Sequence, residues 1–305
     1  MTQLRICLFR PFQAAFTGHN TTCLDAQKVK ELFCYLLLYR HRPHLREHLT
    51  TLLWSDANPD QGRKYLRQTL WQLQTCLETA EAEPLLLLSD NCIQINPRAD
   101  LWLDVQAFET AFTCVQGRRG RELDAAHAAM LRDLLPLYQG DLLEGCYLDW
   151  CLFERERLQN IYLAMLDKLM GYCETHQLWD EGISYGIYVL RVDTARERTH
   201  RRLMRLHYLA GDRTAALRQY ESCQAALAKE LGVAPARQTT HLNQQICNDE
   251  LDDPGLTPRN PGKDTLPDLL QAMMALRATL HNFQCHIERE IDQIRLAIHH
   301  PDQSA

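Results

Sequence analysis

Residues Asp60–Leu77 read DQGRKYLRQTLWQLQTCL, and this stretch decides how the first third of the chain is interpreted. At about 100° per residue, four leucines share one narrow arc of a helix: Leu66, Leu70, Leu73 and Leu77. A neighbouring arc is basic, polar and partly aromatic. The pattern predicts a helix that packs on a small domain through its leucines and presents cations outward.

Such a face has two interpretations. Basic amphipathic helices are common, so it could be an ordinary solvated surface. It could also be a recognition helix, with arginines on guanine edges or phosphates, lysine on phosphate and tryptophan on sugar or a thymine methyl. The candidate DNA contacts are Arg63, Lys64, Arg67, Gln68, Trp71, Gln74 and Arg46, the last of which begins the preceding helix and is either a phosphate contact or a surface arginine.

The flanking segments favour the recognition helix. Short apolar pieces in the first 24 residues predict a small antiparallel sheet, and Asp25 predicts the N-cap of a helix over residues 26–39. Residues 45–54 predict a second helix, Asn58-Pro59-Asp60 breaks the chain and caps a third, and LLLLSDNCIQINP (85–97) predicts a hairpin turning at Asp90-Asn91. Strands, three helices and a hairpin are the order of a winged helix, whose third helix enters the major groove.

From Asp104 onward the pattern predicts helices only. Gly182-Ile183 and Ala216-Leu217 are 34 residues apart, and each pair follows a turn. Thirty-four residues is the period of tetratricopeptide-type helical hairpins. The expected fold is therefore mainly α: a winged-helix domain over residues 1–100 and a tetratricopeptide-like helical domain over 101–248.

The C-terminal part predicts a linker and a long helix. Residues 249–267 contain prolines and glycines among charged residues, as linkers do. Residues 268–300 predict an amphipathic coiled-coil helix about 48 Å long, which either pairs with a second copy or folds back on the same chain. The expected dimerisation residues are Leu269, Met273, Leu276, Leu280, Phe283, Ile287, Ile291 and Ile294.

Composition limits the function classes. No apolar run is long enough for a membrane span or a signal peptide, so a cytoplasmic location without a membrane partner is expected. The net charge is −6, yet residues 1–78 hold ten Lys/Arg against six Asp/Glu, which suggests a DNA-facing first domain and an acidic remainder. The twelve cysteines include no C-x-x-C pair and predict buried thiols in a reducing compartment.

In this order of elements, the residues resemble the bacterial transcriptional activator domain family, which includes the Streptomyces antibiotic regulatory proteins. The resemblance covers about residues 4–247. It rests on the helices of residues 25–77, and on LDVQAFE (103–109), LYQGDLLEGCYLDWCLFERERL (137–158) and HRRLMRLHYLAGDRTAALRQYESCQAALAKELGVAP (200–235). It implies an OmpR-like winged helix joined to a tetratricopeptide-type activator domain, with double-stranded promoter DNA and RNA polymerase or a sigma factor as partners.

Other motifs carry no chemistry in this interpretation. His44-Leu45-Arg46-Glu47-His48 matches the H-x-x-E-H zinc motif, but it falls in the second helix of a domain too small for a protease cleft. Residues 255–264 lack the spacing of a phosphate loop. We therefore expect no catalytic residue, no metal and no cofactor.

An aromatic and arginine cluster at Tyr147-Leu148-Asp149-Trp150 and residues 153–157 is either a partner surface or a set of packing residues. The sequence as a whole predicts a non-enzymatic, sequence-specific DNA-binding regulator, an activator that acts as a dimer and recruits RNA polymerase. The alternative is an interaction scaffold that uses its helical solenoid and contacts DNA only incidentally.

Overall fold

The computed structural model describes residues 4–16, 19–20, 24, 26–77 and 84–251. The chain divides into two compact units, Met1–Asp249 and Glu250–Ala305. Most of the predicted linker, the predicted helix over 268–300 and all the predicted dimerisation residues lie outside the described residues. Every helix and strand that the structure describes belongs to the first unit.

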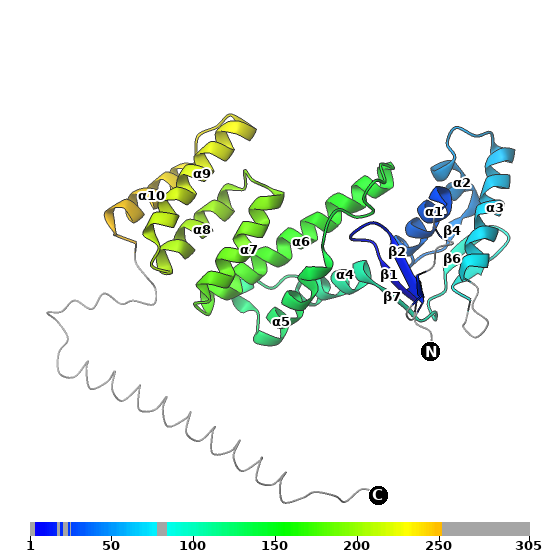
Figure 1. Ribbon diagram of the computed structural model, residues 1–305, viewed down its shortest axis with the longest axis horizontal. Helices are drawn as coiled ribbons and strands as arrows, with labels where there is room; N and C mark the ends of the chain where they lie inside the picture. The colour runs from blue at the N-terminus through cyan, green and yellow to red at the C-terminus, as the bar shows by residue number, and fades with distance from the viewer. Residues whose placement is uncertain (1–3, 17–18, 21–23, 25, 78–83, 252–305) are drawn as a thin grey trace, which may run out of the picture. The chain divides into compact units, whose positions relative to one another are not determined.

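The N-terminal winged helix contains two small sheets (Figure 1). The first has the order β3-β2-β1-β7 and contains β1 (Leu4–Cys7), β2 (Gln13–Phe16), β3 (His19–Asn20) and β7 (Leu101–Leu103). The second has the order β4-β6-β5, from β4 (His44–Leu45), β5 (Leu86–Leu88) and β6 (Cys92–Ile95). The antiparallel strands and the hairpin agree with the sequence, whereas β7 pairs in parallel with β1 and was not predicted.

Three helices follow β3 and precede β5 in the chain: α1 (Gln27–Leu38), α2 (Arg46–Leu53) and α3 (Pro59–Leu77). The Asn58 side chain caps α3 by accepting a hydrogen bond from the Gln61 amide at 2.9 Å. Gly62 permits the close approach of α2 and α3, because a Cβ at this position would overlap the Thr50 methyl group. The helix-turn-helix geometry thus depends on a residue without a side chain.

The prediction that Asp25 caps α1 is wrong. Ala26 is the N-cap residue and makes no side-chain cap hydrogen bond. Its ψ of 123° is extended, so the helix begins one residue later than a cap at Asp25 requires. Burial on nearly all sides of α1 stabilises it instead: residues 31–38 are all buried, with Leu32, Phe33 and Leu36 fully so.

The remainder of the unit is helical, as expected from Asp104 onward. The longer helices are α4 (Asp104–Val115), α5 (Ala125–Leu134), α6 (Asp149–Thr175), α7 (Trp179–Val192), α8 (Glu197–Leu209), α9 (Arg213–Leu231) and α10 (Arg237–Asn248), with short 3-10 turns η2 (Gly120–Glu122) and η3 (Leu135–Leu137). The hairpins α7–α8 and α9–α10 follow one another, and Trp179 and Arg213, which begin α7 and α9, are 34 residues apart. Within the described part of the chain, no helix combines the length and apolar character that crossing a membrane requires.

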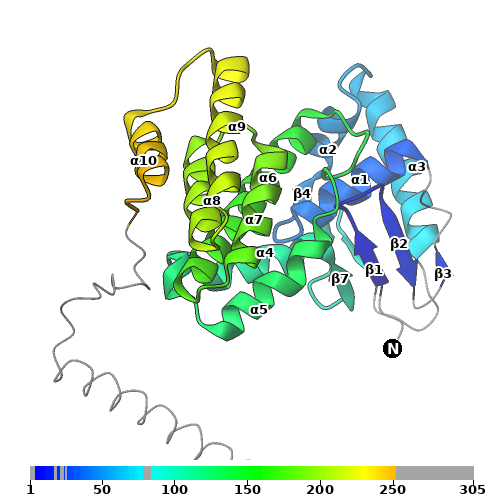
Figure 2. The ribbon, with the colours of Figure 1, turned by 60° about the vertical axis from the view of Figure 1, so that its left-hand side comes forward.

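One hydrophobic core runs from the winged helix into the helical domain. Phe9, just after β1, packs edge-on against Phe108 of α4 with ring centroids 5.1 Å apart. The buried Asp104 carboxylate accepts hydrogen bonds from the Leu8 and Phe9 amides at 2.7 and 3.0 Å. Burial nevertheless raises the pKa of Asp104. Side chains of both domains therefore pack into one hydrophobic core, and the two domains form one compact unit (Figure 2).

Candidate nucleic-acid interface

Helix α3 has a buried side and an exposed side. Leu66, Leu70, Leu73 and Leu77 are buried, as the sequence predicted, together with Gly62 and Thr69. Five of the candidate contact residues are exposed: Arg63, Lys64, Arg67, Gln68 and Trp71. In both views α3 lies on the side of the winged helix away from α7–α10 (Figures 1 and 2). Helices α7–α10 therefore do not cover this face.

The cations of this face differ in how they are engaged. The Arg63 guanidinium donates to the Asp60 carboxylate at 2.9 Å, and both side chains are mainly exposed. The side chains of Lys64 and Arg67, by contrast, form no hydrogen bond or ion pair with any described residue. Two cationic side chains thus have their full donor capacity available to a ligand.

Trp71 and Gln74 complete the face near the C-terminal half of α3. The Trp71 side chain is 66% exposed, which is unusual for the largest apolar residue on a surface without a partner. Gln74 is half-buried. Thr75, which the sequence pattern did not single out, is also exposed and donates a hydrogen bond to the Trp71 carbonyl at 2.9 Å. Because Thr75 follows Trp71 by four residues, helical spacing alone places it on the same face, and this was the signal in the sequence.

Arg46 joins the start of α2 to the hairpin of β5 and β6. Its Nε donates to the Ser89 carbonyl at 3.1 Å, and its backbone amide donates to the Asn91 carbonyl at 2.9 Å. The side chain therefore supports the hairpin turn, and its remaining guanidinium N–H groups stay available for a phosphate. The turn itself places Asp90 at the surface, so the tip of the hairpin is acidic.

The histidines of the H-x-x-E-H match have other partners. His44 lies in β4, before α2 begins, so the two histidines do not share a helix. The His44 Nε2 lies 3.0 Å from the Tyr39 carbonyl oxygen, and the His48 Nε2 lies 3.1 Å from the Tyr35 hydroxyl. Burial lowers the pKa of His44. Among the described residues, no cluster of three His, Cys, Asp or Glu side chains has the arrangement of a metal site.

The aromatic and arginine cluster divides into two parts. Trp150 is buried and packs edge-on against Tyr35 of α1, with ring centroids 5.4 Å apart. Arg155 donates to the carbonyl oxygens of Leu142, Leu143 and Cys146. Tyr147 and Phe153, in contrast, are 78% and 71% exposed. One part fixes the junction of the two domains, and the other leaves aromatic rings in solvent.

Comparison with known proteins agrees with this geometry. Residues 103–247 match the model of the bacterial transcriptional activator domain. The matched segment, just under half of the chain, is similar to this domain. This confirms the resemblance seen in the sequence, and the match begins at the last residue of β7, one residue before α4.

Two individual proteins extend the comparison over the winged helix. The regulatory protein AfsR of Streptomyces coelicolor is 26% identical over 245 residues, which are 80% of this chain and 24% of AfsR. The chain thus spans about a quarter of the length of that relative. Mycobacterium tuberculosis EmbR, solved in complex with a low affinity phosphopeptide, superposes with a TM-score of 0.61 at 20% identity, over 83% of this chain and 67% of EmbR. The predicted fold, a winged helix followed by a helical domain, is confirmed.

Proposed function

We propose that this chain is a sequence-specific DNA-binding transcription regulator whose α3 enters the major groove. The observation that carries the proposal is the availability of Lys64 and Arg67 on the exposed side of α3, opposite its buried leucines. Arginine can bind the O6 and N7 atoms of guanine with two hydrogen bonds, and lysine suits phosphate as a compact charge. We assign base reading to Arg67 and phosphate contact to Lys64.

The other candidate residues have supporting roles in this proposal. Arg63 reaches DNA after leaving Asp60, an exchange that costs little because exposed ion pairs are weak. Trp71 packs on a sugar or a thymine methyl, and Gln68 and Gln74 bond base edges or water. Arg46 reaches a phosphate beside the hairpin. Because these cations displace counterions from the phosphates, affinity should fall as salt rises.

The test is selection of bound sequences from a random DNA duplex pool with the full chain, followed by affinity measurements on the recovered motif. We expect one common motif, bound less tightly by Arg67→Ala with a changed base preference at one position. Recovery of no common motif would overturn the proposal and favour the alternative, an interaction scaffold.

We further propose that the chain activates transcription by recruiting RNA polymerase through its activator domain. Tyr147 and Phe153 support this, because exposed aromatic rings are enriched where proteins bind partners. The double variant Tyr147→Ser, Phe153→Ser should bind promoter DNA normally but activate poorly in transcription with purified polymerase. Unchanged activation would exclude this surface.

The dimer remains part of the proposal, although its residues lie outside the described ones. Pairing through residues 268–300 would present two α3 helices to a repeated DNA element and raise the effective concentration for the second half-site. Light scattering before and after truncation at Pro267 tests it. An unchanged mass would favour a helix that folds back on its own chain.

A further inference from the structure

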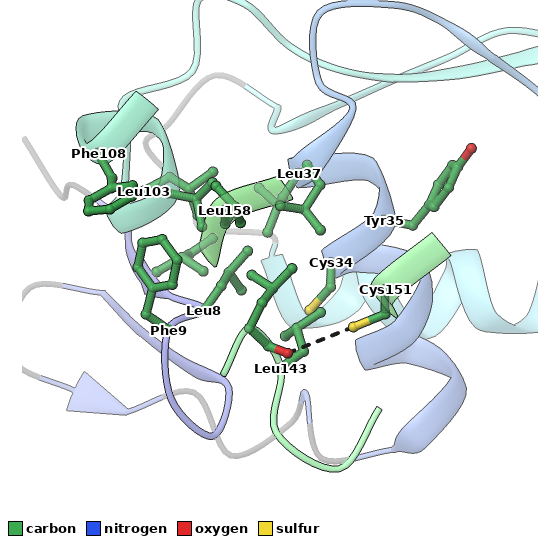
Figure 3. Close-up of a cluster of buried hydrophobic side chains, with 14 of the residues drawn as sticks. Leu8, Phe9, Cys34, Tyr35, Leu37, Leu103, Phe108, Leu143, Cys151 and Leu158 are labelled. Atoms are coloured by element: carbon green, nitrogen blue, oxygen red, sulfur yellow. Dashed lines mark hydrogen bonds between the residues drawn. The ribbon is translucent and has the colours of Figure 1, made fainter. Parts of the chain in front are cut away.

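Three cysteines meet where the winged helix joins the activator domain. Cys34 comes from α1, Cys146 from the loop before α6 and Cys151 from the first turn of α6. All three are buried and carry free thiols. Cys34 and Cys151 belong to the buried cluster drawn in Figure 3, together with Leu8 and Phe9 of the winged helix.

Cys146 and Cys151 lie close together, and each thiol shifts the pKa of the other. The hydrogen bond of the Cys151 thiol goes to the Leu142 carbonyl oxygen. The Cys151 sulfur lies 3.8 Å from the Leu142 carbonyl oxygen, and a dashed line marks this contact in Figure 3. The two cysteines are five positions apart in the chain, one in the loop before α6 and one in its first turn, so a bond between them would close only a small ring.

A cavity gives solvent access to one thiol of this pair. It has a volume of about 240 Å³, and its lining includes Phe12, Lys30, Cys34, Leu143 and Cys146. Cys146 is 9% exposed, whereas Cys34 and Cys151 are fully buried. A small oxidant that enters the cavity therefore meets Cys146, the more exposed of its two lining thiols, whereas Cys151 does not line the cavity.

The surroundings also make Cys146 the more reactive thiol. The neighbouring Cys151 thiol holds the pKa of Cys146 below its ordinary value, and the Leu148 amide acts in the same direction. The pKa of Cys151 is raised by the Cys146 thiol and by burial. Since the thiolate is the nucleophile in cysteine oxidation, Cys146 should react first.

We propose that Cys146 and Cys151 are a redox-active pair that a hydroperoxide converts to a disulfide. The Cys146 thiolate attacks one peroxide oxygen, the O–O bond breaks, and a sulfenic acid and hydroxide form. The Cys151 sulfur then attacks the Cys146 sulfur, while its proton and the departing hydroxyl leave as water. In sum, two thiols lose two electrons and two protons, and hydrogen peroxide becomes two molecules of water. A dithiol reductant reverses the reaction.

The pair is placed to affect the junction between the domains. The loop that carries Cys146 also carries Leu143, whose amide donates to the Leu8 carbonyl of the winged helix at 2.9 Å. The turn of α6 that carries Cys151 also holds Trp150 against Tyr35. The disulfide therefore links the two segments of the activator domain that contact the winged helix.

Peptide mapping of the full chain tests the proposal. The protein is reduced, freed of reductant, exposed to hydrogen peroxide, denatured and alkylated with N-ethylmaleimide. Trypsin leaves both cysteines in one peptide, residues 133–155. We expect this peptide to lose two hydrogen atoms and to take up no N-ethylmaleimide, and to take up two after reduction. Cleavage with chymotrypsin between the cysteines should leave the two fragments linked.

The exposed Cys114 provides a matched control. Cys114→Ala should form the disulfide as the wild type does, whereas Cys151→Ala should leave Cys146 as a sulfenic acid that dimedone traps. The proposal is overturned if residues 133–155 stay fully alkylatable under peroxide that oxidises Cys114. It is equally overturned if Cys146 is recovered linked to Cys34. Because both results come from the wild-type chain, they hold even if a variant fails to fold.

Discussion

Helices α3 and α8 are both rich in arginine, but the structure uses the two sets of cations differently. Helix α8 carries Arg198, Arg201, Arg202 and Arg205; the first three each lie within 4 Å of a carboxylate, and Arg205 is exposed without an ion pair to a described residue. Helix α3 carries Lys64 and Arg67, for which the described part of the chain supplies no acidic partner. By sequence alone α8 would be at least as good a DNA-binding candidate. The two helices therefore differ in the share of their Lys and Arg side chains that the described residues leave unpaired: two of three on α3 and one of four on α8.

The difference has a simple origin in the neighbouring elements. Helix α6 supplies Asp167 and Glu174, and both accept hydrogen bonds from Arg202. The Arg202 side chain is only 14% exposed, so its charge serves the packing of α6 and α8. Beside α3, by contrast, Asp60 is the one acidic side chain that the structure pairs with a described cation of the helix. Four predictions test the contrast.

The largest effect should come from the buried side of α3. Leu73 is fully buried, so Leu73→Ala removes packed methyl groups and leaves a cavity. We expect the free energy of unfolding to fall by about 2–5 kcal/mol. Urea titration measures it, with Trp71→Ala as the control on the exposed side, where the change should be about 0.5 kcal/mol or less. Equal losses in the two variants would mean that α3 does not pack as described.

Arg67→Ala should weaken DNA binding without destabilising the fold. Loss of a base contact costs about 1–3 kcal/mol, which is roughly a fivefold to 150-fold rise in Kd. Fluorescence anisotropy on the selected duplex measures this effect. Arg205→Ala is the matched control, because Arg205 is an exposed arginine on α8. If both variants lose affinity equally, the contrast between α3 and α8 has no functional meaning.

The third effect concerns the paired arginines. Arg202→Ala removes hydrogen bonds to two carboxylates that remain partly solvated, so we expect a loss of stability of about 1–2 kcal/mol. Affinity for DNA, measured where the variant is fully folded, should not change. Thermal unfolding and anisotropy together check both statements. A weaker DNA complex at unchanged stability would instead place α8 in the interface.

The sequence predicted the helices well because their signals are local. The leucine spacing and the Asn58 cap place α3 within one residue of its observed start, Pro59. Strand β7 was missed because it is only three residues long and its partner β1 lies about a hundred residues earlier in the chain. Local periodicity contains no information about such a pairing.

The candidate site was predicted only in part for a similar reason. Periodicity places Arg63 and Arg67 on one face, but it does not reveal that Asp60 pairs with Arg63 and that Arg67 stays unpaired. Nor does it show that Trp150 is buried while Tyr147 is exposed, because that depends on where α1 packs. Which polar side chains find partners is a property of the tertiary structure.

The smallest effect concerns Asp60. Its carboxylate pairs with an arginine of α3, as carboxylates pair with arginines of α8. Asp60→Asn removes the acidic partner of Arg63 and a negative charge near the DNA, while leaving a side chain of similar shape. The pair is exposed, so its strength is about 0.2–1 kcal/mol, and we expect Kd for DNA to fall by roughly 1.5-fold to fivefold. In an Arg63→Ala background the part of this gain that depends on releasing Arg63 should vanish, and the double-mutant cycle isolates it. A gain of the same size in both backgrounds would mean that Asp60 acts only by repelling phosphate, and Arg63 would then have no place among the DNA contacts.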